Sequence, residues 1–136
     1  MQDRPTYSEL IEAVQHFLEN AAVPGLAGPK KFHARVAANV LAIVRRELEG
    51  EHAQLRAEWE RLDELLGVGE SLPADRADLR ERVRARTELL CARIRDGVAD
   101  HGPWRARVWA HARQTVVEKL AVANPKYLES DRRGDR

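Results

Sequence analysis

The five histidines are the side chains of this sequence best suited to metal binding or to acid–base catalysis near neutral pH. They are scattered, and no HExxH or paired ExxH motif places metal ligands together on one face of a helix. Glu49 and His52 have the ExxH spacing, but Gly50 lies between them and is predicted to end a helix, which would separate the two side chains. We therefore predict no metal ion, no cofactor and no catalytic residues.

Lys119 is the charged residue most open to a functional interpretation, because it falls inside the apolar stripe of a predicted helix. Three explanations remain open. Its stem packs against the core while its ammonium group reaches water or the carbonyls that end the helix. Alternatively, it forms a buried ion pair with Glu47, which interrupts the apolar face of another predicted helix. The third explanation is a receptor for an anion or carboxylate in a partly closed pocket.

His33 and Asn39 lie in or beside the apolar arc of the helix predicted at residues 30–49. Polar side chains in such positions usually bond a neighbouring helix, and binding of a ligand is the alternative. Together with Lys119, they are the residues that a small-molecule pocket between helices would use.

The loop before residue 30 is the best candidate for an anion site. Gly25 and Gly28 leave its backbone open, and Lys30 and Lys31 follow at the start of a predicted helix, where free amides attract negative charge. The sequence does not meet the P-loop pattern, and no strand precedes it. The alternative is that these glycines and the neighbouring prolines simply turn the chain.

Apolar side chains recur every three to four residues, which predicts helices, and strand patterns are nearly absent. The first helix begins with a capping box of Thr6 and Glu9 and ends before Pro24. We predict an all-α fold, a single-domain bundle of about five helices over residues 1–128, with a frayed tail at residues 129–136. The other predicted helices are residues 30–49, expected at the centre of the bundle, 51–66, 74–96 and 104–123.

The periodicity also predicts which side chains enter the core. The stripe of the helix at 51–66 is Leu55, Trp59, Leu62 and Leu66. The helix at 30–49 has a wide apolar arc that includes Phe32, Val36 and Val40, and we expect several neighbours to cover it. The arginine-rich outer face of residues 74–96 is expected to pair with the acidic face of residues 51–66, at about 0–1 kcal/mol for each exposed pair.

In the helix at 104–123, the predicted inward stripe is Val108, Ala112, Thr115, Val116, Lys119 and Ala123. Trp104 faces inward, whereas Trp109 lies toward the edge of the stripe, and an exposed Trp109 would be a suitable interface anchor. Tyr127 and Leu128 follow the helix stop, and we expect them to fold back onto the bundle or to dock on another subunit.

The composition argues against several classes of protein. Of the 136 residues, 43% are hydrophobic and 33% are charged, which is typical of a globular domain, and the net charge of +1 argues against a dedicated nucleic-acid binder. No apolar run reaches the roughly 18 residues that span a bilayer, and the first residues lack an apolar signal segment. The single cysteine, Cys91, cannot form an internal disulfide, so we expect a cytoplasmic protein.

Residues 32–41 (FHARVAANVL) and 119–128 (KLAVANPKYL), with Arg4-Pro5-Thr6, resemble a family of short bacterial proteins carried as a domain of unknown function. The resemblance spans nearly the whole chain and is least distinct over residues 49–98. Members are often encoded beside acyl-CoA dehydrogenases and aminoglycoside-phosphotransferase-like kinases, so the resemblance implies a setting in acyl-CoA or fatty-acid breakdown. It implies no activity and defines no catalytic residues.

These observations favour a non-catalytic helical accessory protein that forms a homo-oligomer and serves an acyl-CoA dehydrogenase or a phosphotransferase-like protein. The alternative is a protein that binds acyl-CoA, phosphate or another anion, or a minor enzyme, with a pocket around Lys119, His33 and Asn39. We expect no nucleic acid and no membrane among its partners, because acidic neighbours dilute the arginine face of residues 74–96.

Overall fold

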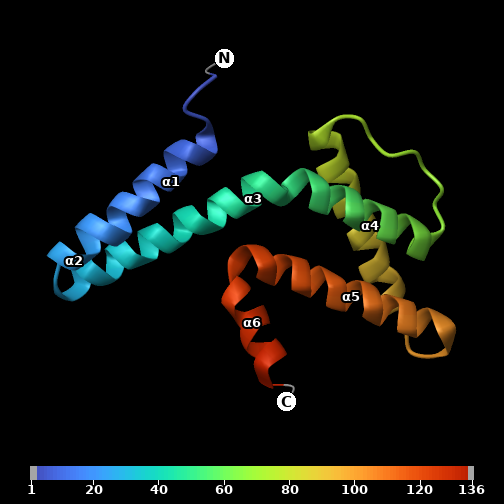
Figure 1. The fold of residues 1–136 in the computed structure, drawn as a ribbon. Helices are drawn as coiled ribbons and strands as arrows, with labels where there is room; N and C mark the ends of the chain where they lie inside the picture. The colour runs from blue at the N-terminus through green and yellow to red at the C-terminus, as the bar shows by residue number, and fades with distance from the viewer. Residues whose placement is uncertain (1–2, 135–136) are drawn as a thin grey trace. The chain divides into compact units, whose positions relative to one another are not determined.

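The computed structural model describes residues 3–134, including the side chains of residues 3–129. No strand occurs in this part of the chain, which confirms the predicted all-α fold. In chain order the elements are α1 (Tyr7–Phe17), the π-helical turn η1 (Leu18–Ala22), α2 (Val23–Gly25), α3 (Gly28–Leu66), α4 (Arg76–Arg95), α5 (Gly102–Ala123) and α6 (Pro125–Gly134), as Figure 1 shows.

The chain divides into two compact units, residues 1–50 and residues 51–136, which we call unit 1 and unit 2. Unit 1 contains α1, η1, α2 and the first part of α3, and unit 2 contains the second part of α3 with α4, α5 and α6. One helix thus contributes to both units.

The prediction that Gly50 ends a helix is wrong, because α3 continues through it to Leu66. Glycine inside a helix costs about 1 kcal/mol relative to alanine. The flanking residues 45–49 and 51–56 are mostly strong helix formers, and their preference outweighs this cost. The helices predicted at 30–49 and 51–66 are therefore two parts of α3.

The segment after α5 is more regular than expected. The stop at Asn124-Pro125 is correct for α5, but Pro125 begins α6, where its fixed φ angle suits the first helical position. Residues 129–134, which we predicted to be a frayed tail, are helical, and residues 135–136 lie outside the described residues.

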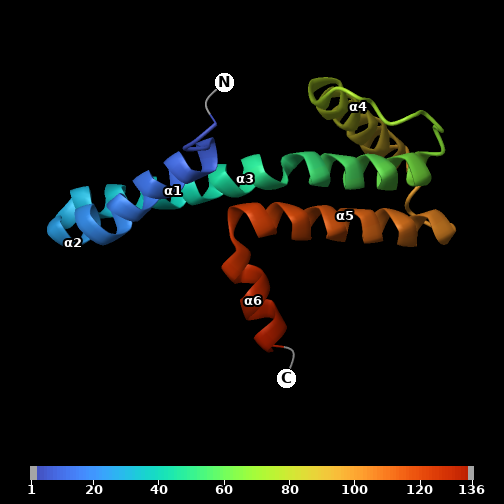
Figure 2. The ribbon, with the colours of Figure 1, turned by 45° about the horizontal axis from the view of Figure 1, so that its top comes forward.

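The two helices of unit 1 form an antiparallel hairpin, with α1 beside the first part of α3 in both views (Figures 1 and 2). The hydroxyl group of Ser8 donates a hydrogen bond to Glu49, and Arg45 Nη1 lies 3.9 Å from Glu12 Oε1. The capping box at the start of α1 is confirmed, because the Thr6 amide donates to the Glu9 carboxylate at 2.7 Å and the Glu9 amide to Thr6 Oγ1 at 3.3 Å.

The apolar arc predicted inside the bundle is exposed in unit 1. Phe32, Val36 and Val40 are 63%, 43% and 49% exposed. Ala38 and Ala42, on the same side of α3 as Arg45, are the buried hydrophobic side chains among the described residues of this unit. The small alanines let α1 approach closely, which leaves the larger side chains of α3 on other sides of the helix.

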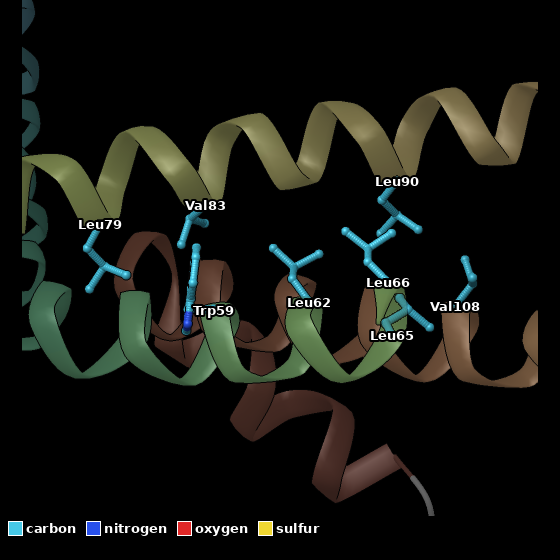
Figure 3. Close-up of a cluster of buried hydrophobic side chains, with 8 residues drawn as sticks. All are labelled: Trp59, Leu62, Leu65, Leu66, Leu79, Val83, Leu90 and Val108. Atoms are coloured by element: carbon cyan, nitrogen blue, oxygen red, sulfur yellow. The ribbon is translucent and has the colours of Figure 1, made fainter. Parts of the chain in front are cut away.

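The core of unit 2 lies where the second part of α3, α4 and α5 meet (Figure 3). Its buried apolar members are Trp59, Leu62, Leu65, Leu66, Leu79, Val83, Leu90 and Val108. Leu55 and Trp104 pack against this cluster from partly buried positions. The predicted stripe of residues 51–66 is therefore confirmed, and Trp104 faces the core as expected.

Charged side chains join α3 to α4 as predicted. Glu51 accepts a hydrogen bond from Arg80 Nε at 2.9 Å, and Arg76 Nη1 lies 3.8 Å from Glu51 Oε2. At the start of α4, Asp75 caps the helix by accepting hydrogen bonds from two of its amides at 2.9 and 3.0 Å.

The end of α3 is held by side chains of α4 and α5. Arg107, Trp104 and Arg93 donate hydrogen bonds to the backbone oxygens of residues 64, 65 and 66, at 2.6, 3.0 and 3.3 Å. These carbonyls have no partner within their own helix, and two of the three donors carry the positive charge that suits a helix C-terminus. Among the described helices, none combines the length and the apolar character needed to cross a bilayer.

Candidate functional site

The inward side of α5 differs from the predicted stripe. Val108 and Val122 are buried with His111, and Thr115 and Glu118 are half-buried. Ala112, Val116 and Lys119, which we expected to face inward, are exposed, so that part of the prediction is wrong. The prediction of the inward stripe used only the spacing of apolar residues. The inward side of α5 instead meets charged side chains of α3 and is itself partly polar.

An ion pair between the two helices is the clearest of these polar contacts. Arg61 of α3 donates two hydrogen bonds to the Glu118 carboxylate of α5, at 2.8 and 2.6 Å. Gln114, one turn earlier on α5, also donates to Glu118, at 2.9 Å. Both members of the pair are partly buried, and the two parallel bonds fix their mutual geometry.

His111 lies beside this pair and is 8% exposed. Burial lowers the pKa of its imidazole below the ordinary value, and the charge of Arg61 lowers it further, against the opposite effect of Glu118. The ring is therefore neutral at pH 7. With Arg61, Leu65 and Arg107 it lines a cavity of about 230 Å³ between α3 and α5.

Two buried polar atoms on α5, from residues one turn apart, have no hydrogen-bond partner among the described residues, namely His111 Nδ1 and Thr115 Oγ1. A serine- or threonine-type nucleophile requires a hydrogen bond to its base, and a further group must orient that base. This pair has neither feature. The atoms are instead available to a bound water or a small ligand.

The positive charge of Lys119 affects the pKa of Glu58, a carboxyl group of α3. Burial raises the pKa of the Glu58 carboxyl group, while the charges of Lys119 and Arg61 act in the opposite direction. The ammonium group of Lys119 itself is on an exposed side chain. Glu47, its proposed partner, belongs to unit 1, so the predicted pairing of Lys119 with Glu47 stays a prediction.

The other predicted ligand residues are in unit 1, in the first part of α3. Lys30, His33 and Asn39 are exposed and Lys31 is half-buried, and the His33 ring meets the Phe32 ring edge-on with centroids 5.7 Å apart. The pocket proposed around Lys119, His33 and Asn39 would draw on both units and stays a prediction.

Continuity of α3 places Glu49 and His52 on one helix, one turn apart, contrary to the expected break at Gly50. In the described part of the chain, no group of three or more His, Cys, Asp or Glu side chains could hold a metal ion.

A second cavity, of about 420 Å³, is an apolar groove between α5 and α6. It is lined by Trp109, Ala112, Arg113, Val116, Val117, Leu120, Tyr127 and Leu128. Trp109 is 66% exposed, as its position at the edge of the stripe indicated, and Tyr127 is 57% exposed. We call this feature the α5–α6 groove. The sequence signals for it were Trp109, at the edge of the predicted stripe, and Tyr127 and Leu128, after the helix stop. Ala112 and Val116, which also line it, we had assigned to the inward stripe.

Residues 24–127 match a family model described as a domain of unknown function, DUF6285. No curated protein and no solved structure matches the chain.

Proposed function

This chain belongs to the DUF6285 family of domains of unknown function, and we propose that it is a non-catalytic accessory protein that docks an amphipathic helix of a partner protein. The observation that carries the proposal is the α5–α6 groove, where exposed apolar side chains of two helices converge on one cavity. Such a groove matches the helix-in-groove mode of recognition.

The dimensions of the groove support a helical ligand. Its lining on α5 runs from Trp109 to Leu120, which is about 16 Å or three turns of helix. Tyr127 and Leu128 of α6 form the opposite wall. A partner helix of three or four turns would therefore lie along α5 with one apolar stripe buried.

Two residues define the chemistry of that ligand. Trp109 supplies a large, exposed aromatic surface of the kind that dominates binding energy at interfaces. Arg113 is the charged residue of the lining, so the partner helix should carry a carboxylate beside its apolar stripe.

We further propose an acyl-CoA dehydrogenase or a phosphotransferase-like protein as the partner, in the cytoplasm. This part rests on the resemblance of residues 32–41 and 119–128 to the bacterial family and on the gene setting that it implies.

The test uses Trp109→Ser and, as a matched control, Val98→Ser, because Val98 is a comparably exposed apolar residue outside the groove. Binding of the purified dehydrogenase and kinase of the host is measured by calorimetry. We expect Trp109→Ser to weaken binding by about 30-fold or more and Val98→Ser to leave it unchanged. Binding that survives Trp109→Ser would contradict docking in the groove.

One observation favours a second function, the binding of a small molecule between α3 and α5. His111 Nδ1 is buried without a partner among the described residues, and the side chain lines a cavity together with Arg61, Arg107 and Glu64. Acyl-CoA, CoA or a nucleotide bound there should raise the melting temperature of the protein by several degrees at concentrations far above the dissociation constant. The His111→Leu variant should lose this shift, and no shift with any of these compounds at millimolar concentration would exclude them.

A further inference from the structure

The contact between α3 and α5 in unit 2 contains buried polar atoms that lack partners. The second part of α3 runs beside α5 in both views (Figures 1 and 2). Arg61 Nε, His111 Nδ1 and Thr115 Oγ1 are buried there and have no hydrogen-bond partner among the described residues. The other such atom described in unit 2 is Arg86 Nη1, which lies 2.9 Å from Asp63 Oδ1 and is therefore paired by charge. In the described part of unit 2, the unused hydrogen-bonding capacity thus lies between α3 and α5.

A cavity of about 230 Å³ lies at this contact. It is lined by Arg61, Glu64 and Leu65 of α3 and by Arg107, Ala110 and His111 of α5. Leu65 and Ala110 make part of the wall apolar, and the imidazole of His111, which is 8% exposed, belongs to the same lining. At about 30 Å³ for each water molecule, the volume holds about eight non-hydrogen atoms. The cavity therefore has room for a small molecule or for one end of a larger molecule.

The unpartnered atoms indicate which chemical group a ligand presents. Arg61 uses Nη1 and Nη2 for the Glu118 carboxylate, and its remaining Nε–H group can only donate. The hydroxyl group of Thr115 donates as well as accepts, and Nδ1 of the neutral His111 ring donates in one of its tautomers. A ligand group that reaches these atoms must therefore present oxygens that accept hydrogen bonds.

The charges around His111 favour an anionic oxygen. They belong to Arg61 and Glu64 of α3 and to Arg107 and Glu118 of α5. Burial and then the positive charge of Arg61 lower the pKa of the ring, and the opposing effect of Glu118 is smaller. The Glu64 side chain is 82% exposed, so water screens its charge. The potential beside the ring is therefore positive, which stabilises a bound carboxylate.

We propose that the cavity binds a small monocarboxylate with an apolar body. The carboxylate accepts hydrogen bonds from Arg61 and His111, and the apolar body lies against Leu65 and Ala110. This inference rests on the second function proposed above, the binding of a small molecule between α3 and α5, and names the class of that molecule. Hexanoate, with about eight non-hydrogen atoms, matches the volume and serves as the probe.

The first test compares hexanoate, hexanamide and inorganic phosphate by calorimetry with the full chain at neutral pH. Hexanoate should bind with a dissociation constant of about 0.1–1 mM, which is typical of a ligand of this size. Hexanamide has the same shape without the charge and should bind at least about 10-fold more weakly. Phosphate has no apolar body and should not compete with hexanoate. Equal affinities for hexanoate and hexanamide, or no binding of hexanoate, would overturn the proposal.

Two variants locate the site. His111→Leu keeps an apolar side chain in the buried position and should weaken hexanoate binding by about 10-fold or more. The matched control is Trp109→Ser, which changes the α5–α6 groove on the same helix and should bind hexanoate as the wild type does. Hexanoate binding that survives His111→Leu, or that is lost in Trp109→Ser, would contradict the assignment to this cavity.

A third measurement needs no variant. The His111 ring is titrated by NMR with and without saturating hexanoate. A carboxylate beside the ring opposes the effect of Arg61, so the pKa of His111 should rise when hexanoate is bound. By linkage, hexanoate should also bind more tightly as the pH falls from 7 to about 6. An unchanged pKa at saturation would contradict a carboxylate in contact with this ring.

The outcomes separate this inference from the function on which it rests. A thermal shift with CoA compounds that disappears in His111→Leu, together with no binding of hexanoate, would refute the monocarboxylate and keep the small-molecule site. The absence of every His111-dependent shift would refute both. Docking of a helix in the α5–α6 groove is tested separately, because Trp109 does not line this cavity.

Discussion

The guanidinium carbon of Arg86 lies 3.3 Å from the centroid of the Trp59 ring, inside the core of unit 2. Arg86 is 5% exposed, and Nη1 lies 2.9 Å from Asp63 Oδ1 while Nη2 donates to Glu70 Oε2 at 3.3 Å. An arginine at this depth is stable because two carboxylates balance its charge and an aromatic face covers its plane.

The replacement Arg86→Met should therefore destabilise the protein strongly. It leaves Asp63 without its cation in a partly buried position and removes the contact with Trp59, at a cost of about 2–4 kcal/mol. Urea unfolding followed by circular dichroism measures this cost. The control is Arg84→Met, because Arg84 is highly exposed and pairs only with Glu88 one turn away, which should cost about 0.5 kcal/mol or less. Equal costs for the two variants would contradict a structural role for the buried cation.

The hydrogen bond from Trp104 to the end of α3 should be measurable on its own. Trp104→Phe keeps an aromatic ring against the core but leaves the Leu65 oxygen without its donor, which should cost about 1–2 kcal/mol in the free energy of unfolding. Trp109→Phe serves as the control, because Trp109 is exposed in the groove, and its cost should be a few tenths of a kcal/mol.

Gly67 ends α3 in a left-handed conformation, with φ of +67°. A Cβ atom there would meet no atom within 4 Å, so Gly67→Ala changes backbone strain alone and should cost about 1 kcal/mol. Gly25→Ala has equally open surroundings without a positive φ, and it should be neutral or slightly stabilising. Thermal unfolding of the two variants separates strain from crowding. If Gly67→Ala were as stable as Gly25→Ala, the left-handed end of α3 would be wrong.

The lowered pKa of His111 predicts a loss of stability in mild acid. Above about pH 6.5 the imidazole is neutral in the folded and unfolded chain, so it adds no pH dependence. Below that pH the unfolded chain takes up a proton that the folded chain resists, because the ring is buried beside Arg61, and stability falls until the lowered pKa is reached.

The His111→Gln variant isolates this contribution. Its stability should vary less between pH 6.5 and 5 than that of the wild type, in unfolding titrations at matched ionic strength. The raised pKa of Glu58 acts with the opposite sign, since stability is lost as its carboxyl ionises with rising pH, but it is present in both proteins and cancels in the comparison. Parallel pH profiles would show that His111 does not titrate abnormally.

Local signals in the sequence were sufficient for the all-helical fold, for some helix ends and for part of the core. The capping box of Thr6 and Glu9 and the stop at Asn124-Pro125 involve residues close in the chain, so their geometry follows from residue type and spacing. The stripe around Trp59 and Leu62 is apolar on one side only, and its burial could therefore be predicted. The prediction from Gly50 was wrong because the helix propensity of the residues on either side outweighed the low helix propensity of glycine.

The functional features depended on contacts that no local pattern encodes. The inward orientation of His111 and Glu118 depends on Arg61 of another helix. The burial of Arg86 depends on Asp63 and the Trp59 ring of α3 and on Glu70 of the loop that follows it. Ala112 and Val116 look like core residues along one helix, and only the path of α6 makes them part of the wall of a groove.

The sequence by itself therefore determined that the chain is helical and where several helices begin and end. These properties depend on residue type and on spacing along the sequence. The tertiary structure alone decided which apolar faces are covered and which charges are buried. Burial depends on what lies opposite a side chain, and the residues opposite are distant in sequence.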